Sequence, residues 1–245
     1  MSAFAKYGSN ALAEFLDAPD VAYGTGDDGS VVFDGSSTVL GLTPSSSIYS
    51  MTRDLYCYDL ELASNVSLQP NGYRIFVKNI LTLNDGSVIG WPTATGWSTV
   101  GTLAQGGALQ TQVTNSLGGD GAGGTYTATP PSAALGGPKY YEQPHQAIKG
   151  YSITASGGPT YLTGGGGGSV APGLGGGVIV LAARYIACAA TSTNAVIRAE
   201  GGASNAGGGV ILVVSTEPAL PSNVSTSVVG NGNGSNGTYK FMQLV

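Results

Sequence analysis

The sequence is poor in charged residues, and in positive charge above all. Charged residues make up 9% of the 245 residues, with nine Lys or Arg against 14 Asp or Glu. Globular domains average about 25%. A nucleic-acid groove needs clustered cations to displace counterions from phosphates, and an anionic membrane attracts only polybasic segments. We therefore expect neither nucleic acid nor a membrane as a partner.

Cysteine and histidine are nearly absent. The chain has two cysteines, Cys57 and Cys188, and one histidine, His145. Both cysteines stand in apolar, strand-like runs, where free cysteine behaves as a small hydrophobic residue, so we expect no disulfide. One imidazole and two distant thiols cannot build a zinc site. We expect no metal site and no cofactor.

Catalytic motifs are missing as well. No Gly-x-Ser-x-Gly turn leads a strand into a helix, and a lone histidine without a nearby nucleophile and acid makes no triad. Asp59 and Glu61 share one side of a strand, about 7 Å apart by strand geometry, and paired carboxylates can hydrolyse glycans. We interpret this pair as a solvent-facing surface. We therefore predict no catalytic residues and a protein that is not an enzyme.

Long apolar runs are also lacking. No run approaches the roughly 20 residues of a membrane-spanning helix. The first residues contain one cation, Lys6, and no apolar signal core, which argues against a secretory signal peptide. We expect the protein to be made and folded in a cytoplasm.

Alternating apolar residues are abundant between positions 31 and 91. Val31-Val32-Phe33 opens a strand, Leu60 and Leu62 alternate with the acids, and Asn71-Gly72 is a tight-turn dipeptide. Alternation interrupted by Asn and Gly predicts a series of strands. We expect them to be about three to five residues long.

A repeat is visible near the C-terminus. Three glycines lead into apolar runs at 178–181 and again at 210–214, an offset of 32 residues. Second strands are expected at 195–197 and 227–229, and the segment 73–90 has the same order. Imperfect copies of this kind favour an all-β fold of stacked coils, a β-helix or β-solenoid with Gly-rich insertions. A jelly-roll or β-sandwich is the alternative.

The sequence divides into four regions: an attachment arm at 1–30, β-rich coils at 31–91, a Gly-rich surface or insertion region at 92–177, and β-rich C-terminal coils at 178–245. In the arm, Leu12, Phe15 and Leu16 form the apolar side of a short helix that docks on a partner, caps a strand or frays. Positions 105–177 contain 21 of the 41 glycines. We read them as surface loops, or as close-packed extended chains.

Aromatic residues in and beside the Gly-rich region are the candidates for contact with a ligand or a host surface. Tyrosine among glycine, serine and threonine is typical of adaptable binding surfaces. The two tryptophans can anchor an interface or cap the core. The candidates are Trp91, Trp97, Tyr126, Tyr140, Tyr141, Tyr151 and Tyr161.

The stretch 55–89 resembles surface proteins of tailed-phage particles. The resemblance is carried by 52–56, Leu60, 68–77, 81–83 and Gly86, with Gly-Asp-Asp-Gly at 26–29 and the later Gly-Gly-Gly-Val-Ile-Val-Leu. It covers about half the chain. It implies a β-helical, homotrimeric structural protein of the virion, assembled in the host cytoplasm.

Such a protein is similar to a capsid decoration, a head spike, or a short tail fibre or spike. Its partners would be its own copies, other capsid or tail proteins and a host-surface glycan. The chain lacks the long shaft of a full tail fibre. Two further hypotheses remain open, a glycan-cleaving tailspike-like enzyme and a non-viral adhesin.

Overall fold

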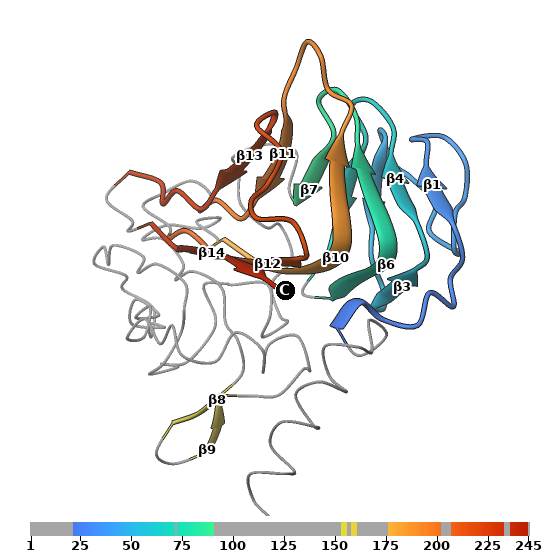
Figure 1. Cartoon of the computed structure of the whole chain (residues 1–245). Helices are drawn as coiled ribbons and strands as arrows, with labels where there is room; N and C mark the ends of the chain where they lie inside the picture. The colour runs from blue at the N-terminus through green and yellow to red at the C-terminus, as the bar shows by residue number, and fades with distance from the viewer. Residues whose placement is uncertain are drawn as a thin grey trace, which may run out of the picture.

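The computed structural model describes residues 22–71, 73–90, 153–155, 158–160, 176–201, 207–232 and 236–244. Within them the chain is almost entirely strands joined by turns (Figure 1). The strands are β1 (Val31–Phe33), β2 (Ile48–Ser50), β3 (Leu55–Cys57), β4 (Leu60–Leu62), β5 (Ser67–Gln69), β6 (Arg74–Leu83), β7 (Val88–Gly90), β8 (Ile153–Ala155), β9 (Gly158–Thr160), β10 (Val178–Cys188), β11 (Ala195–Arg198), β12 (Val210–Ser215), β13 (Val224–Ser227) and β14 (Thr238–Gln243). The expected all-β class is confirmed.

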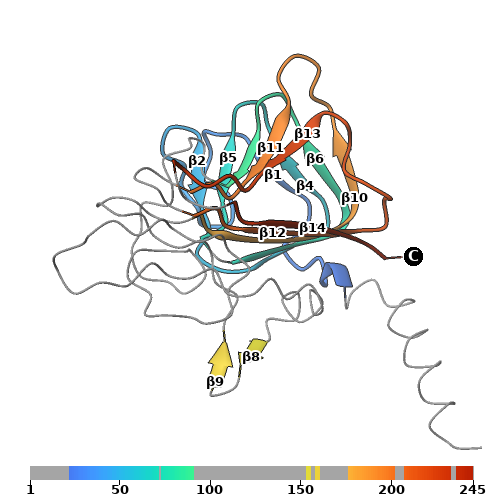
Figure 2. The same ribbon diagram turned by 90° about the vertical axis from the view of Figure 1, so that its left-hand side faces the viewer.

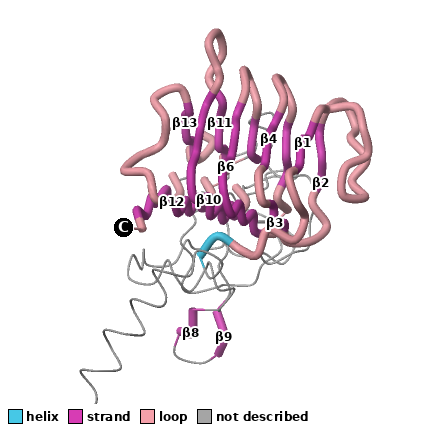
Figure 3. The backbone as a smooth tube through the Cα atoms, turned by 45° about the vertical axis from the view of Figure 1, so that its right-hand side comes forward, coloured by secondary structure: helices cyan, strands magenta, loops and turns pink. Residues whose placement is uncertain are grey.

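Two parallel sheets make up the body of the molecule (Figure 3). The large sheet has the order β1-β4-β6-β10-β12-β14, with β3 also paired to β6, and the small sheet has the order β13-β11-β7-β5-β2. Every pairing within these two sheets is parallel. The jelly-roll alternative, which requires antiparallel neighbours, is therefore wrong.

The chain crosses from the large sheet to the small sheet and back along the body. Each crossing adds a strand to each sheet beside the strand laid down by the previous crossing, except that the second passage adds both β3 and β4 to the large sheet. We call one such passage a coil. Figure 2 shows the two sheets edge-on, with the later coils following the earlier ones.

The sequence repeat corresponds to this pairing. Val178 pairs with Val210, so the 32-residue offset is the structural register. The third copy lies on the other side of β10, where Leu181 pairs with Ile75. One expected strand was misplaced: β11 pairs with β13 at Val224–Ser227, and not with 227–229. The sequence of that strand, Val-Ser-Thr-Ser, contains one apolar residue and therefore shows no apolar alternation.

Four strands are longer than three to five residues: β12 and β14 have six each, and two others are about twice as long as expected. β6 has 10 residues and β10 has 11. Their pairing continues through a register shift between Ala183 and Tyr185, and such irregularities bend a strand without ending it. The antiparallel pair β8–β9 falls inside the Gly-rich region, where the sequence predicted no regular strand.

Apolar side chains from the two sheets meet in one core. In β1, Val31 and Phe33 are buried while Val32 is 49% exposed, as alternation requires. Leu62, Leu181 and Ile197 are completely buried. The residues packed against this core are contributed by nearly every coil. Because no short strand can bury its own apolar side alone, the coils stabilise one another.

The outer side of the large sheet is apolar too. A second cluster there contains Phe76, Val180 and Leu212, and Ala22 and Tyr23 pack against it. Strands of a parallel sheet that are buried on both faces read as continuous apolar runs. This explains the continuous apolar runs at 178–183 in β10 and 210–214 in β12.

Candidate functional site

The ten residues predicted from the sequence to contact partners lie outside the described residues. They are Trp91, Trp97, Tyr126, Tyr140, Tyr141, Tyr151, Tyr161, Leu12, Phe15 and Leu16. Their roles stay predictions. His145 lies outside as well. The described residues nevertheless show how the Gly-rich region is joined to the body.

The connections from the small sheet back to the large sheet form the candidate site. They are 51–54, 70–73, 91–177, 199–209 and 228–237. Because the strands within each sheet are parallel, the ends of the small-sheet strands lie at one edge, and so do the starts of the large-sheet strands. All five connections therefore leave from and return to the same side of the body. We call this side the return corner.

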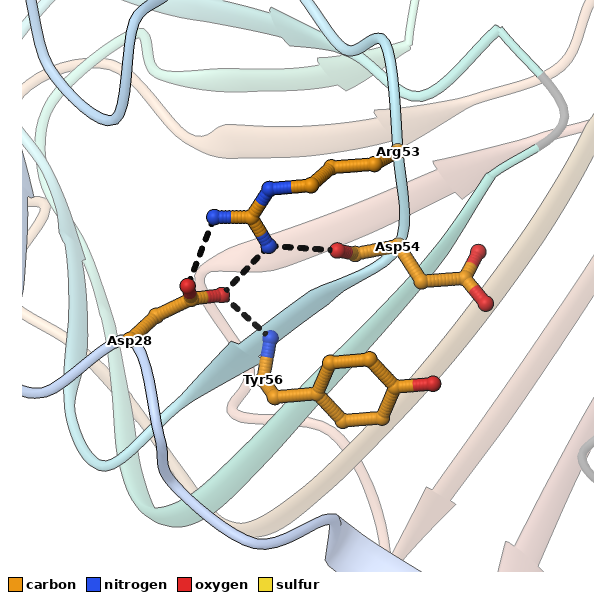
Figure 4. Close-up of polar contacts among 4 residues, drawn as sticks. All are labelled: Asp28, Arg53, Asp54 and Tyr56. Carbon is orange, nitrogen blue, oxygen red and sulfur yellow. Dashed lines mark hydrogen bonds and ion pairs between the residues drawn. The ribbon is translucent and has the colours of Figure 1, made fainter.

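Charged side chains fasten the connection 51–54 to the coils on either side of it, and Figure 4 shows the contact with Asp28. Arg53 donates to both carboxylate oxygens of Asp28, at 2.6 and 2.9 Å. The same guanidinium donates to the backbone oxygen of Asp54 at 2.9 Å, and the Tyr56 N–H donates to Asp28 at 2.7 Å. The hydrogen bond from Arg53 is the main reason that the pKa of Asp28 is lowered.

The second ion pair joins the next coil. Arg74 donates through its backbone N–H and its Nε to the Asp54 carboxylate, each at 2.8 Å, and Nη2 forms an ion pair with the same group. Asn71 adds a bond from its side-chain amide to the Met51 carbonyl at 3.1 Å. Each bond spans two successive coils, so both connections are held at a fixed length.

At the longer connections, glycine residues stand where the backbones of neighbouring coils come close together. A Cβ on Gly208 would lie 1.8 Å from the Val228 oxygen, and one on Gly237 would lie 1.8 Å from the Gly209 oxygen. Real Cβ atoms do not come that close, so only glycine fits where backbones touch in this way.

Backbone bonds seal the bases of the last two connections. The Gly209 N–H donates to the Ala199 oxygen at 2.7 Å, and the Gly237 N–H donates to the Val228 oxygen at 2.8 Å. Each bond links the end of a small-sheet strand to the start of the following large-sheet strand. The two ends of each of these connections are therefore hydrogen-bonded to each other.

The connection 91–177 begins and ends within the same stack. Gly90, its last preceding residue, pairs with Arg198 at the end of β11. Gly176, near its other end, donates to the Gly207 oxygen at 2.9 Å. Trp91 follows Gly90 directly, so the predicted contact residues belong to a segment that starts at the return corner.

The carboxylates proposed as an alternative catalytic pair have structural partners. Asp59 accepts from Ser30 Oγ at 2.8 Å and from Asn79 Nδ2 at 2.7 Å. Glu61 accepts from Asn84 Nδ2 at 3.0 Å. These bonds connect neighbouring coils. They give both acids the role of fasteners between strands.

Asp85 accepts several hydrogen bonds from the turn between β10 and β11. Its Oδ1 accepts from the backbone N–H groups of Thr191 and Ser192, at 2.6 and 3.0 Å. Backbone donors stabilise the carboxylate and lower its pKa to about 2. The bonds fix the turn between β10 and β11 against the preceding coil.

Both cysteines are free. Burial raises the pKa of Cys57 to about 12, so it stays a thiol. Among the described residues, no group of three His, Cys, Asp or Glu side chains is placed to hold a metal ion. In the turn before β1, the Asp28 carboxylate accepts hydrogen bonds from Arg53 and from the Tyr56 N–H, and the Gly29 carbonyl accepts one from the Tyr58 N–H.

Sequence reasoning missed the charged fasteners. Asp28 and Arg53 are 25 positions apart, and Asp54 and Arg74 are 20 apart. Only the coil register shows that they meet. The sequence shows a glycine triplet before each of two strands. The recurrence of these triplets at an offset of 32 residues was the available signal that the backbones of neighbouring coils touch there.

The chain was compared with protein-family models, with curated proteins and with solved structures, and none of the three comparisons found a match. In the parts of the chain that the structure describes, no helix is both long and apolar enough to cross a membrane.

Proposed function

We propose that this chain is a β-solenoid structural protein on the surface of a tailed-phage particle, where it presents Gly-rich segments to the surroundings and catalyses no reaction. The particle could carry it as a capsid decoration, head spike, short tail fibre or tail spike. The observation that supports this most is the return corner, where long connections leave a body of interlocked parallel strands.

The solenoid part of the proposal rests on the order of the strands. Successive coils pair in register through two parallel sheets, and the same core continues through them. A body of this kind gains rigidity from every added coil. It suits a mechanical role on a particle exposed to solvent.

The display part of the proposal rests on the bases of the connections. Backbone bonds at Gly209 and Gly237 join the two ends of each of the last two connections. The segment 91–177 contains the predicted contact residues, and its low charge and many tyrosines suit adhesion to neutral, polar surfaces such as glycans. Adhesion would then depend on that segment alone.

The particle assignment is tested on particles released by cells that produce the chain. An antibody raised against the purified protein should label sedimented particles at the head or the tail. A chain that remains in the unsedimented fraction would contradict the proposal and favour the non-viral adhesin.

The adhesive role is tested with purified protein and host cells. Replacing Trp91 and Trp97 by serine should lower cell binding at least tenfold, while the far-UV circular dichroism and the unfolding midpoint stay unchanged. Serine at exposed Tyr58, in the body, serves as the control. Equal binding by all three proteins would contradict display by this segment.

The absence of catalysis is tested by incubation with host polysaccharide. No oligosaccharide should be released over a day. Release that is lost when Asp59 and Glu61 are replaced by amides would establish the enzyme instead.

Self-association is the third element. We propose a homotrimer, anchored to capsid or tail proteins by the first 30 residues through Leu12, Phe15 and Leu16. The native mass should equal three copies of the 24.4 kDa chain or a multiple of three. Removing residues 1–20 should abolish recovery with particles and leave the number of copies in the assembly unchanged.

A further inference from the structure

Within the described residues, the last coil leaves part of the core uncovered. Among the described strands, β14 pairs only with β12. Phe241 is partly buried and Tyr239 is 36% exposed. Their pairing partners on β12, Val213 and Ile211, are completely buried. At the same position along the sheet, the side chain is therefore completely buried on β12 and partly exposed on β14.

The outer backbone edge of β14 is open as well. Thr238 donates to the Gly209 oxygen at 3.0 Å, and Leu244 donates to the Ser215 oxygen at 2.8 Å. In a parallel ladder alternate residues bond to the same neighbour. The N–H and C=O groups of Tyr239, Phe241 and Gln243 therefore point away from β12, to the side where the described residues provide no strand.

The opposite end of the body is closed by its own chain. The connection 34–47 is fixed by Asp34, which accepts from the Ser36 and Ser37 N–H groups at 2.7 Å each and from the Tyr49 hydroxyl at 3.0 Å. Val39 and Leu40 of this connection pack against the core. The first coil is thus covered in a way that the last coil is not.

β14 has few of the features that protect an edge strand from pairing. Natural edge strands carry proline, bulges or several charges to prevent association. β14 has the sequence Thr-Tyr-Lys-Phe-Met-Gln, with one charge and no proline, and it pairs with β12 in unbroken register. A strand of this kind favours the addition of another strand.

We propose that β14 pairs antiparallel with β14 of a second copy, across a twofold axis at Phe241. In an antiparallel ladder, two opposite residues that exchange both backbone bonds must each point their N–H and C=O at the other. Centring the axis on Phe241 uses all three outward-pointing residues. The two large sheets then continue into each other.

Side chains agree with this register. The two Phe241 rings lie side by side, and Tyr239 lies opposite Gln243 of the second copy. Lys240 lies opposite Met242 of the second copy, so like charges do not face each other, and facing like charges would be destabilising. A twofold contact of this kind is self-complementary and closed. It does not depend on the phage assignment or on a threefold contact elsewhere.

The contact is tested by proline at an outward-facing N–H. Gln243→Pro removes a donor that β12 does not use, whereas Gln243→Ala keeps it, and both lose the bond from the Gln243 side chain to Thr216. Native mass at 50 µM should be an even number of copies for the wild type and for Gln243→Ala, and half of that for Gln243→Pro. Circular dichroism reports whether each variant folds.

The register is tested by oxidation in a Cys188→Ala background. Paired residues on the axis have Cα atoms about 5.5 Å apart, within reach of a disulfide. Phe241→Cys should give a covalent dimer. Tyr239→Cys should not, because position 239 lies opposite position 243 of the second copy, and the two cysteines would be offset by four residues along the ladder. An odd copy number in the wild type, an unchanged mass for Gln243→Pro, or equal cross-linking at both positions would each overturn the proposal.

Discussion

The first coils and the last coils make the same connection between two sheets with different residues. At 51–54 and 70–73 the chain returns in four residues, and charged side chains fasten each turn to its neighbour. At 199–209 and 228–237 the return is longer, and backbone bonds at glycine seal its base. In 51–54 the charged residues Arg53 and Asp54 belong to the connection itself. In 199–209 and 228–237 the bonded residues Gly209 and Gly237 stand at the end of the connection.

This difference decides which connections can vary in length. Inserting residues beside Arg53 or Asp54 moves the fastening groups, because they belong to the connection. Inserting residues between Gly201 and Gly207 leaves the seal in place. The longest connection, 91–177, lies between the short connection 70–73 and the glycine-sealed connection 199–209.

The largest expected effect comes from filling the glycine contact. Gly208→Ala places a methyl group 1.8 Å from the Val228 oxygen, and the stack must separate locally to relieve it. We expect a loss of about 3–5 kcal/mol in unfolding free energy, the upper range for single substitutions. Urea unfolding followed by circular dichroism measures it.

Gly41→Ala is the matched control for that substitution. Gly41 has a φ of 78°, and a methyl group added to it would stand in open space. The substitution should cost about 1 kcal/mol from backbone strain alone. Equal losses for the two variants would show that close contact at the return corner is not important.

The next largest effect comes from lengthening the connections. Three residues of Gly-Ser-Gly inserted between Met51 and Thr52 should cost about 2 kcal/mol, because they displace charge-assisted hydrogen bonds. The same insertion between Ser204 and Asn205 should cost about 0.6 kcal/mol or less, the entropy of closing a longer loop. Thermal unfolding of both variants tests the comparison, and a reversed order would refute it.

Removing one fastener should have a smaller effect. Asp28→Asn leaves Arg53 without its carboxylate partner, and we expect a loss of about 1–2 kcal/mol because Arg53 is half exposed. Asp27→Asn, at the neighbouring position, is the control and should change stability by less than about 0.5 kcal/mol. Urea midpoints at pH 7 distinguish them.

The smallest effect is a dependence on acid. The pKa values of Asp28 and Asp85 are lower in the folded protein, that of Asp85 reaching about 2. A lowered folded pKa stabilises the protein above the ordinary value of 3.8 and loses that contribution as the pH falls through the folded value. The unfolding midpoint should be constant from pH 7 to 5 and fall below pH 4. The gap between wild type and Asp28→Asn should close in the same range.

The regular part of the fold could be predicted from the sequence, since apolar alternation and a fixed offset are local or periodic signals. The register between Val178 and Val210 and the edges of β1 followed from them. The strand β13 was missed because one valine precedes three hydroxyl residues. The length of β6 could not be predicted, because Lys78 and Asn79 at its register shift interrupt the apolar alternation.

The candidate site was less accessible to sequence reasoning. The fastening between Asp54 and Arg74 depends on which coil follows which, and no pattern within a short window contains that information. Glycine triplets showed where strands start, but the contact of Gly208 with Val228 requires knowledge of the neighbouring coil. Long-range pairing had to be known before these residues acquired roles.

The hydrogen bonds at the bases of the last two connections have a consequence for how such a chain can change over generations. The two ends of each connection are hydrogen-bonded to each other, so the sequence between them can be replaced as one unit. A new tip sequence could therefore be acquired by recombination between glycine codons, without any adjustment of the strands that carry it.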